Sequence, residues 1–336
     1  MTLSVSIVVP VHNGGESFRT CLAGLNQVRS TFDELIVVAD GDTDSSWLAA
    51  ERWGAQVIRL PQSGGPARAR NQGARVAQGD ILFFLDADVC ISPEAVKQVA
   101  NVFKRDRGLA ALIGSYDDAP GANNFLSQYR NLLHHYTHQT ACADASTFWG
   151  ACGAIRRDVF MAVGGFDERY RHPSIEDIEL GYRLKSRGYR IRLDRQIQVK
   201  HLKCWQAKSM LKADFFYRAL PWTELILQKS GLINDLNLKT SSRISVVLAY
   251  AFSLLFIASI LSTLSSQINS PILAMACLAA LVTLLLINLP IYRFFWRKRG
   301  KRFAVRVVPW HCLYYLYSGL AFAIGWLRHR TRLVIN

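Results

Sequence analysis

The chain has 336 residues, half of them hydrophobic, and its 40 Lys and Arg exceed its 25 Asp and Glu to give a formal net charge of +15. This length accommodates one large domain or two. Much of the excess charge flanks apolar segments near the C-terminus, and no basic motif with interleaved aromatic residues is present, so we expect no nucleic-acid partner.

The first 90 residues alternate between apolar, β-branched runs and segments of helical character. This alternation predicts a mostly parallel sheet with helices on both faces, an α/β domain whose ligand lies at the carboxyl ends of the strands. The predicted strands are residues 5–11, 34–39, 57–60 and 81–85, and the predicted helices are residues 17–28, 45–53 and 66–77.

Polar residues follow three of the predicted strands. They are His12 and Asn13 after the first strand, which carries Pro10 at its end, Asp40 after the second, and Asp86 and Asp88 after the fourth. Each group is also an ordinary turn sequence, but together they converge on one edge of the sheet. Two carboxylates at one strand end suit magnesium or manganese, which complete their shells with water and substrate phosphates. We therefore expect a nucleoside diphosphate as the ligand.

The segment 64–73 follows the third strand and opens the third predicted helix. Its glycines, Gly64 and Gly65, allow close approach of an anion to the backbone, and Arg68 or Arg70 would neutralise phosphate. The alternative is a helix start that is simply well capped.

Four motifs, in residues 10–13, 36–44, 65–73 and 85–88, together resemble the nucleotide-sugar half of family 2 glycosyltransferases. The resemblance covers roughly residues 4–205. It implies the GT-A fold, a single α/β domain that transfers a sugar from a nucleoside diphosphate with inversion.

The resemblance also implies roles for individual residues on the donor side. Pro10, His12 and Asp40 would border the nucleobase, Asp86 would approach the ribose, and Asp88 would hold the metal. Further donor contacts are expected from Asn13, Gly65, Arg70 and Asn71. The family commonly has two acids before Gly41, whereas this chain has Ala39 and Asp40, which leaves the base unidentified.

The acceptor side is expected in the second half of the domain. Residues 148–155 predict a strand with small residues, and they resemble the family's segment beneath the transferred sugar. Trp149, Gly150 and Gly153 are therefore candidate acceptor residues, although small residues equally suit close packing.

Residues 174–188 predict a helix that starts with a capping-box-like pair, Ser174 and Asp177. Acids in a first turn need no further explanation, because the helix dipole favours them. The resemblance nevertheless assigns Asp177 as the base that deprotonates the acceptor and Glu176 as its support.

The segment 199–205 resembles the Gln-x-x-Arg-Trp element of membrane-bound glycan synthases. His201 replaces the Gln and Cys204 replaces the Arg, so we infer no processive polymer synthase. We expect His201 to complete the metal site with Asp86 and Asp88, and Trp205 to stack on the acceptor. A purely structural histidine is the alternative.

The domain organisation follows from the apolar pattern. Residues 1–235 would form the catalytic domain, ending in interfacial helices at about 205–235, and residues 236–336 would form a membrane region. Spans are expected at about 244–264 and 272–292, each long enough to cross a bilayer, with 265–270 as the outer turn. A third apolar segment, 309–327, either spans or lies partly in the interface.

The expected location is the plasma (inner) membrane, with the catalytic domain in the cytoplasm. Basic residues precede the first span and follow the second, which favours cytoplasmic ends, and the first residues lack the pattern of a signal peptide. The seven scattered cysteines are then expected to be free thiols.

The sequence therefore predicts a membrane-anchored, inverting glycosyltransferase that depends on manganese or magnesium. Its donor would be a nucleoside-diphosphate sugar and its acceptor lipid-linked, in envelope or exopolysaccharide synthesis. A nucleotidyltransferase that attacks the α-phosphate is one alternative. An inactive scaffold is another, and Ala39 and Cys204 are the residues that favour it.

Overall fold

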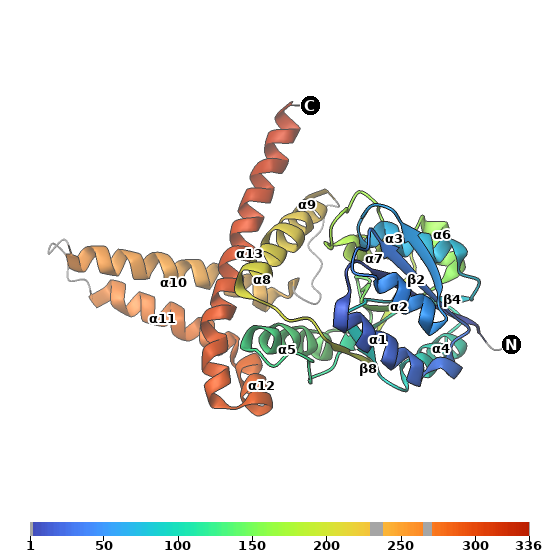
Figure 1. The fold of residues 1–336 in the computed structure, drawn as a ribbon. Coiled ribbons are helices and arrows are strands. Elements are labelled where there is room, and N and C mark those ends of the chain that lie inside the picture. Colours follow the sequence, from blue (N-terminus) through green and yellow to red (C-terminus); the bar gives the residue numbers. More distant parts are fainter. Residues whose placement is uncertain (1–2, 229–237, 265–270, 336) are drawn as a thin grey trace. The chain divides into compact units, whose positions relative to one another are not determined.

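The computed structural model describes residues 3–228, 238–264 and 271–335 (Figure 1). The chain divides into two compact units, Met1–Ala213 and Asp214–Asn336. The domain boundary expected at residue 235 and the outer turn expected at 265–270 lie outside the described residues.

The first unit is built on an eight-stranded mixed sheet with the strand order β3-β2-β1-β4-β7-β6-β8-β5. The strands are β1 (Val5–Val11), β2 (Glu34–Asp40), β3 (Gln56–Leu60), β4 (Ile81–Leu85), β5 (Val89–Ile91), β6 (Leu109–Tyr116), β7 (Cys152–Arg156) and β8 (Arg190–His201). The first four strands pair in parallel, so their carboxyl ends share one edge, whereas β7 runs antiparallel to both β4 and β6.

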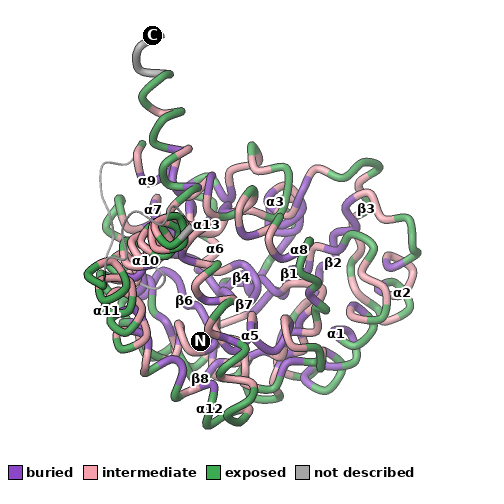
Figure 2. The backbone as a smooth tube through the Cα atoms, turned by 90° about the vertical axis from the view of Figure 1, so that its left-hand side faces the viewer, coloured by how far each residue is buried: buried purple, intermediate pink, exposed green. Residues whose placement is uncertain are grey.

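Helices cover both faces of this sheet, and Figure 2 shows the strands buried between them. These elements are α1 (Gly15–Gln27), η1 (Arg29–Thr31), α2 (Ser46–Trp53), α3 (Pro66–Val76), α4 (Ala95–Arg105), α5 (Phe125–Thr140), α6 (Arg157–Val163), α7 (Glu176–Ser186) and α8 (Ala207–Lys212). On one face, α1, α2 and α4 share a buried cluster with β1, β2 and β4. On the other, α3 lies so close that a Cβ on Gly73 would meet Val8 at 2.5 Å.

The predicted α/β class is confirmed, and each of the four predicted strands and three predicted helices is present with small shifts at its ends. Two local predictions are wrong. The strand expected from Phe148 begins only at Cys152, because the Gly150 N–H donates to the Asp177 carboxylate and not to a neighbouring strand. The expected capping box is absent: Ile175 occupies the N-cap of α7, which has no side-chain cap hydrogen bond.

The second unit is helical. Its elements are a π-helical turn η2 (Ala213–Ala219), α9 (Leu220–Gln228), α10 (Thr240–Leu264), α11 (Pro271–Ile287), α12 (Leu289–Arg299) and α13 (Lys301–Ile335). In the described residues, α10 and α13 are each long and apolar enough to cross a membrane. Helices α11 and α12 are separated by a bend of 60°. Together they form a third candidate if the pair is one span.

The bend divides the segment 272–292, which the apolar pattern alone does not reveal. Pro290 lies in the first turn of α12, where it removes a backbone donor and disfavours a continuous helix. Asn288, at the bend, donates to the Ser245 hydroxyl at 2.9 Å and accepts from the Tyr315 hydroxyl at 2.7 Å. This buried network links α10, the bend and α13.

Candidate active site

The loops that follow β1 and β2 are joined by hydrogen bonds. The Asn13 N–H donates to Asp42 at 2.9 Å, and the Asn13 side-chain oxygen accepts from the Thr43 N–H at 2.8 Å. The Gly15 N–H donates to Asp44 at 2.8 Å, and His12 Nδ1 lies 2.7 Å from the Asp40 carbonyl oxygen. Asn13 has a φ of 52°, a conformation that Asn tolerates better than most residues. Two of the predicted strand ends therefore form one rigid surface beside Pro10.

Asp40 extends this surface to the loop before α3. Its buried carboxylate accepts hydrogen bonds from the Ser63 hydroxyl and from the N–H groups of Gly64 and Gly65, at 2.8–2.9 Å. Gly65 has a φ of 91°, and a Cβ there would lie 2.5 Å from the Arg171 carbonyl oxygen, so only glycine fits. Asp40 thus holds the glycine loop in place from the end of β2.

Arg70, on α3, lies at the centre of the site. It donates to Asp86 at 2.6 Å and to Glu176 at 2.9 Å, and its side chain is only 4% exposed. Burial opposes the charged form, but the charges of Asp86 and Glu176 outweigh this effect and raise the pKa of Arg70. One cation therefore bridges the acid after β4 and the first turn of α7.

Asp177, next to Glu176 on α7, is held by two backbone donors. One carboxylate oxygen accepts from the Gly150 N–H at 3.0 Å and the other from the Ile178 N–H at 2.8 Å. Burial and the charge of Glu176 raise the pKa of Asp177 to about 7, although the Gly150 N–H and Arg70 act in the opposite direction. A carboxyl group with this pKa can accept a proton near neutral pH.

Asp88 and His201 approach one another where β5 pairs with β8. His201 Nε2 lies 3.7 Å from the Asp88 carboxylate, and the imidazole stacks on the Tyr116 ring with centroids 4.3 Å apart. Burial acts against the charged form of Asp88, but the neighbouring His201, with Lys203, lowers its pKa.

These two side chains provide an acidic oxygen and an imidazole nitrogen, which suits a divalent cation. Within the described parts of the chain, no three His, Cys, Asp or Glu side chains are grouped closely enough to hold a metal alone. Asp86, which the sequence also assigns to the metal, is paired with Arg70. Asp88 and His201 therefore fit a site that substrate oxygens complete.

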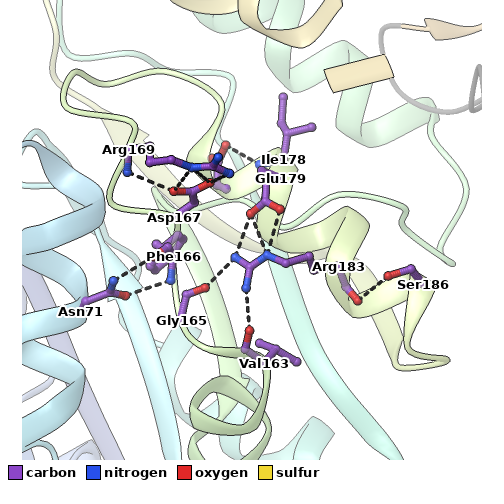
Figure 3. Close-up of polar contacts among 11 residues, drawn as sticks. Asn71, Val163, Gly165, Phe166, Asp167, Arg169, Ile178, Glu179, Arg183 and Ser186 are labelled. Atoms are coloured by element: carbon purple, nitrogen blue, oxygen red, sulfur yellow. Dashed lines mark hydrogen bonds and ion pairs between the residues drawn. The ribbon is translucent and has the colours of Figure 1, made fainter. Parts of the chain in front are cut away.

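Asn71 lies one residue beyond Arg70 but contacts a different region. Its side chain exchanges two hydrogen bonds with the Phe166 backbone, both at 2.8 Å (Figure 3). In the same view, Arg183 of α7 donates to Glu179 and to the carbonyl oxygens of Val163 and Gly165. Asn71 and Arg183 thus hold the loop that leads from α6 towards α7.

The four candidate acceptor residues lie in two environments. Trp149 is half-buried and packs edge-on against Tyr116, with ring centroids 4.8 Å apart. Gly150 and Gly153 are buried. A Cβ on Gly150 would meet Arg70 at 2.9 Å, and a Cβ on Gly153 would meet the Trp149 carbonyl oxygen at 2.3 Å. Trp205 is 6% exposed, and its backbone N–H donates to the Ser127 hydroxyl at 2.7 Å. Gly150 therefore adjoins the Arg70 guanidinium and Trp149 adjoins the Tyr116 ring, whereas Trp205 is anchored to α5.

Sequence reasoning missed Tyr116 and Arg183. Tyr116 ends a strand in residues 89–147, for which we predicted no elements, and its stacking on His201 depends on the β6–β8 pairing. The ion pair of Arg183 could have been predicted from the sequence, because Glu179 precedes it by four residues in a predicted helix.

Comparison with known proteins agrees with this geometry. Residues 6–164 match the family model described as Glycosyl transferase family 2. The uncharacterized glycosyltransferase YibD of Escherichia coli (strain K12) is 35% identical over 96 residues, which cover 27% of this chain and 28% of that protein. A poly-beta-1,6-N-acetyl-D-glucosamine synthase of Staphylococcus aureus (strain COL) is 25% identical over 203 residues, covering 56% of this chain and 48% of that protein. The chain thus matches less than half the length of either relative.

A solved structure resembles the chain over most of its length. The mannosyltransferase PcManGT from Pyrobaculum calidifontis, in complex with GDP-Man and Mn2+, aligns with a TM-score of 0.62 and 18% identity. The alignment covers 96% of this chain and 88% of that one, and at this identity it shows a shared fold. This chain therefore contains a glycosyl transferase family 2 domain with a GT-A-like α/β fold.

Proposed function

We propose that the protein is a membrane-anchored, inverting glycosyltransferase that moves a sugar from a nucleoside diphosphate to a lipid-linked acceptor. The observation that carries this proposal is the bridge from Asp86 through Arg70 to Glu176. This bridge supports the proposal because Asp86, which we assign to the donor, and Asp177, which we assign as the base, then lie at one edge of the sheet, as a transfer between two substrates requires.

In the proposed step, the Asp177 carboxylate removes the proton from an acceptor hydroxyl while the acceptor oxygen attacks C1 of the donor sugar. The bond between C1 and the diphosphate oxygen breaks, and the nucleoside diphosphate leaves with the electron pair. Attack on the face opposite the leaving group inverts C1. The Gly150 N–H orients Asp177 for this role.

Asp88 and His201 are the residues that would hold a divalent cation in this mechanism. Such a cation would neutralise charge on the departing diphosphate. In the neighbouring ion pair, Arg70 keeps the Asp86 side chain oriented towards the same edge. The Asp88 carboxylate oxygen suits either manganese or magnesium.

The proposal of a lipid-linked acceptor rests on the second unit. Helices α10 and α13 have the length and composition of membrane spans, and many of their large apolar side chains are exposed, including Val247, Leu254, Val305 and Leu327. Exposed apolar surface of this extent suits contact with lipid. A poly-beta-1,6-N-acetyl-D-glucosamine synthase is among the relatives, and we include a role in envelope or exopolysaccharide synthesis in the proposal.

Asp177→Asn should abolish transfer while leaving the donor bound. We expect sugar transfer to fall by roughly 100-fold or more, because general-base catalysis typically contributes that much. The assay measures sugar transferred and nucleoside diphosphate released, with nucleotide binding followed separately by thermal stabilisation. Release of nucleoside monophosphate would instead indicate a nucleotidyltransferase.

The matched control is Asp158→Asn, which alters an exposed acid in the first turn of α6. It should retain activity. Full turnover by Asp177→Asn would remove that residue as the base, and no turnover by the wild type with any donor would favour the scaffold alternative.

The pH–rate profile should follow the ionisation of Asp177. Because its pKa is raised to about 7 and the base must be ionised, the rate should rise with pH up to about 7 and then level off. The same raised pKa predicts that the folded state becomes less stable as pH rises from about 4 to 7. In this range the unfolded state has already lost the Asp177 proton, whereas the folded state still holds it.

Glu176→Gln should move the rising limb of that profile to lower pH, because the charge of Glu176 raises the pKa of Asp177. The measurement is kcat against pH for the wild type and the variant. A limb that stays in place or moves to higher pH would contradict this coupling.

Asp88→Ala and His201→Ala should each weaken metal-dependent binding of the donor. The readout is the thermal shift produced by a nucleoside diphosphate with and without manganese. We expect the manganese-dependent part of the shift to be lost, while Asp80→Ala, at the amino-terminal edge of β4, should preserve it. An unchanged manganese effect in both site variants would place the cation elsewhere.

Native cysteines allow the cytoplasmic location to be tested. Cys142 and Cys204 are exposed on the catalytic unit. A membrane-impermeant maleimide should modify them in inside-out membrane vesicles and not in right-side-out vesicles. The double variant Cys142→Ser, Cys204→Ser identifies their share of the labelling, and labelling of these two residues in right-side-out vesicles would reverse the topology.

A further inference from the structure

A cavity of about 260 Å³ opens at the carboxyl ends of β2 and β3. Its lining consists of Ala39, Asp42, Trp47, Arg59, Leu60 and Pro61. Ala39 occupies the position where the resemblance leads us to expect an acid, so a small side chain leaves space at this point. The two charged groups around that space are the Asp42 carboxylate and the Arg59 guanidinium.

The Arg59 guanidinium is stacked on the Trp47 ring, and its N–H donors remain available. Its guanidinium carbon lies 3.8 Å from the centroid of the Trp47 ring, a stacked cation–π contact. The side chain is exposed, and it has no hydrogen bond or ion pair with any residue that the structure describes. A guanidinium has five N–H donors in one plane, so stacking sets their plane without using them.

Asp42 is oriented by the neighbouring backbone. One of its oxygens accepts from the Asn13 N–H at 2.9 Å and the other from the Trp47 N–H at 3.2 Å. A carboxylate has about four acceptor positions, so both oxygens can accept again. The cavity therefore presents an oriented pair of acceptors and an oriented row of donors.

We propose that this cavity receives the nucleobase of the donor and that Arg59 and Asp42 select guanine. The inference rests on the proposed function and names its donor class, a guanosine-diphosphate sugar. Guanine O6 and N7 accept two hydrogen bonds from one guanidinium, and the guanine N1–H and amino group donate to a carboxylate. Uracil and thymine have one ring N–H between two carbonyls and lack the O6/N7 pair, so they satisfy only part of this set.

The position of the cavity in the sheet fits this assignment. The cavity lies at β2 and β3, whereas Asp86 and Asp88 follow β4, and β1 lies between them. Neighbouring strands are about 4.8 Å apart, so the two places are separated by roughly 10–15 Å. A nucleoside diphosphate, from its base through the ribose to its phosphates, spans a separation of roughly this order, and the ribose would pass over the surface formed by His12 and Asp40.

The test is thermal stabilisation of the full-length protein in detergent by GDP, ADP, UDP, CDP and dTDP, each with manganese. We expect GDP to stabilise the wild type at the lowest concentration. Arg59→Ala should weaken GDP roughly 10-fold or more, the range for loss of a bidentate contact to guanine, and should leave UDP little changed. Arg52→Ala, an exposed arginine on α2 outside the cavity, is the matched control and should behave as the wild type.

Two further variants separate base selection from charge and folding. Arg59→Lys keeps the charge but not the two parallel donors, so it should lose the preference for GDP while still binding diphosphates. Asp42→Asn should weaken GDP selectively, because one acceptor becomes a donor.

The outcomes separate this inference from the proposed function. If the wild type prefers UDP, or if Arg59→Ala leaves the order of nucleotides unchanged, the guanine assignment is wrong and the glycosyltransferase proposal stands. If folded wild-type protein binds none of the five diphosphates, both fail.

Discussion

The buried guanidinium of Arg70 is the interaction on which the catalytic edge depends. It joins α3 to the end of β4, the next strand along the chain, and to α7, in which Glu176 lies 106 residues beyond Arg70. A buried cation without a partner is strongly unfavourable, and breaking a buried pair typically costs about 3–5 kcal/mol. Loss of both carboxylates would therefore leave Arg70 unpaired and disturb the whole edge. The approach of Gly150 to Arg70 shows that even the backbone is shaped around this group.

The same bridge explains why two adjacent acids on α7 differ. Glu176 is paired with Arg70 and is nearly inaccessible to solvent, so it acts as a fixed negative charge. Asp177 accepts hydrogen bonds from two backbone N–H groups, and it experiences both burial and the charge of its neighbour. The environments of the two carboxyl groups therefore separate their roles, one as a positioning residue and one as a proton acceptor.

Much of the fold was predictable because its signals are local. The apolar runs of β1, β2 and β4 and the polar residues that end them are contiguous in the sequence, and so the shared edge follows from parallel pairing. The partners of these polar residues were not predictable. Arg70 was assigned to phosphate, yet its ion pairs depend on Glu176, more than a hundred residues away. Asn71 likewise binds the Phe166 backbone, a contact that only the tertiary fold creates.

The hydrogen bonds of Asp40 change how base recognition can work at this edge. Both carboxylate oxygens of Asp40 already accept hydrogen bonds from the loop before α3. With Ala39 beside it, the end of β2 itself has little polar capacity left for a base. In the proposed site, the base is instead recognised by groups around the neighbouring cavity. There Trp47 sets the plane of the Arg59 guanidinium, and the Asn13 N–H orients the Asp42 carboxylate. Because that orientation exists before any ligand binds, little conformational entropy is lost on binding, and discrimination between bases depends on matching donors and acceptors.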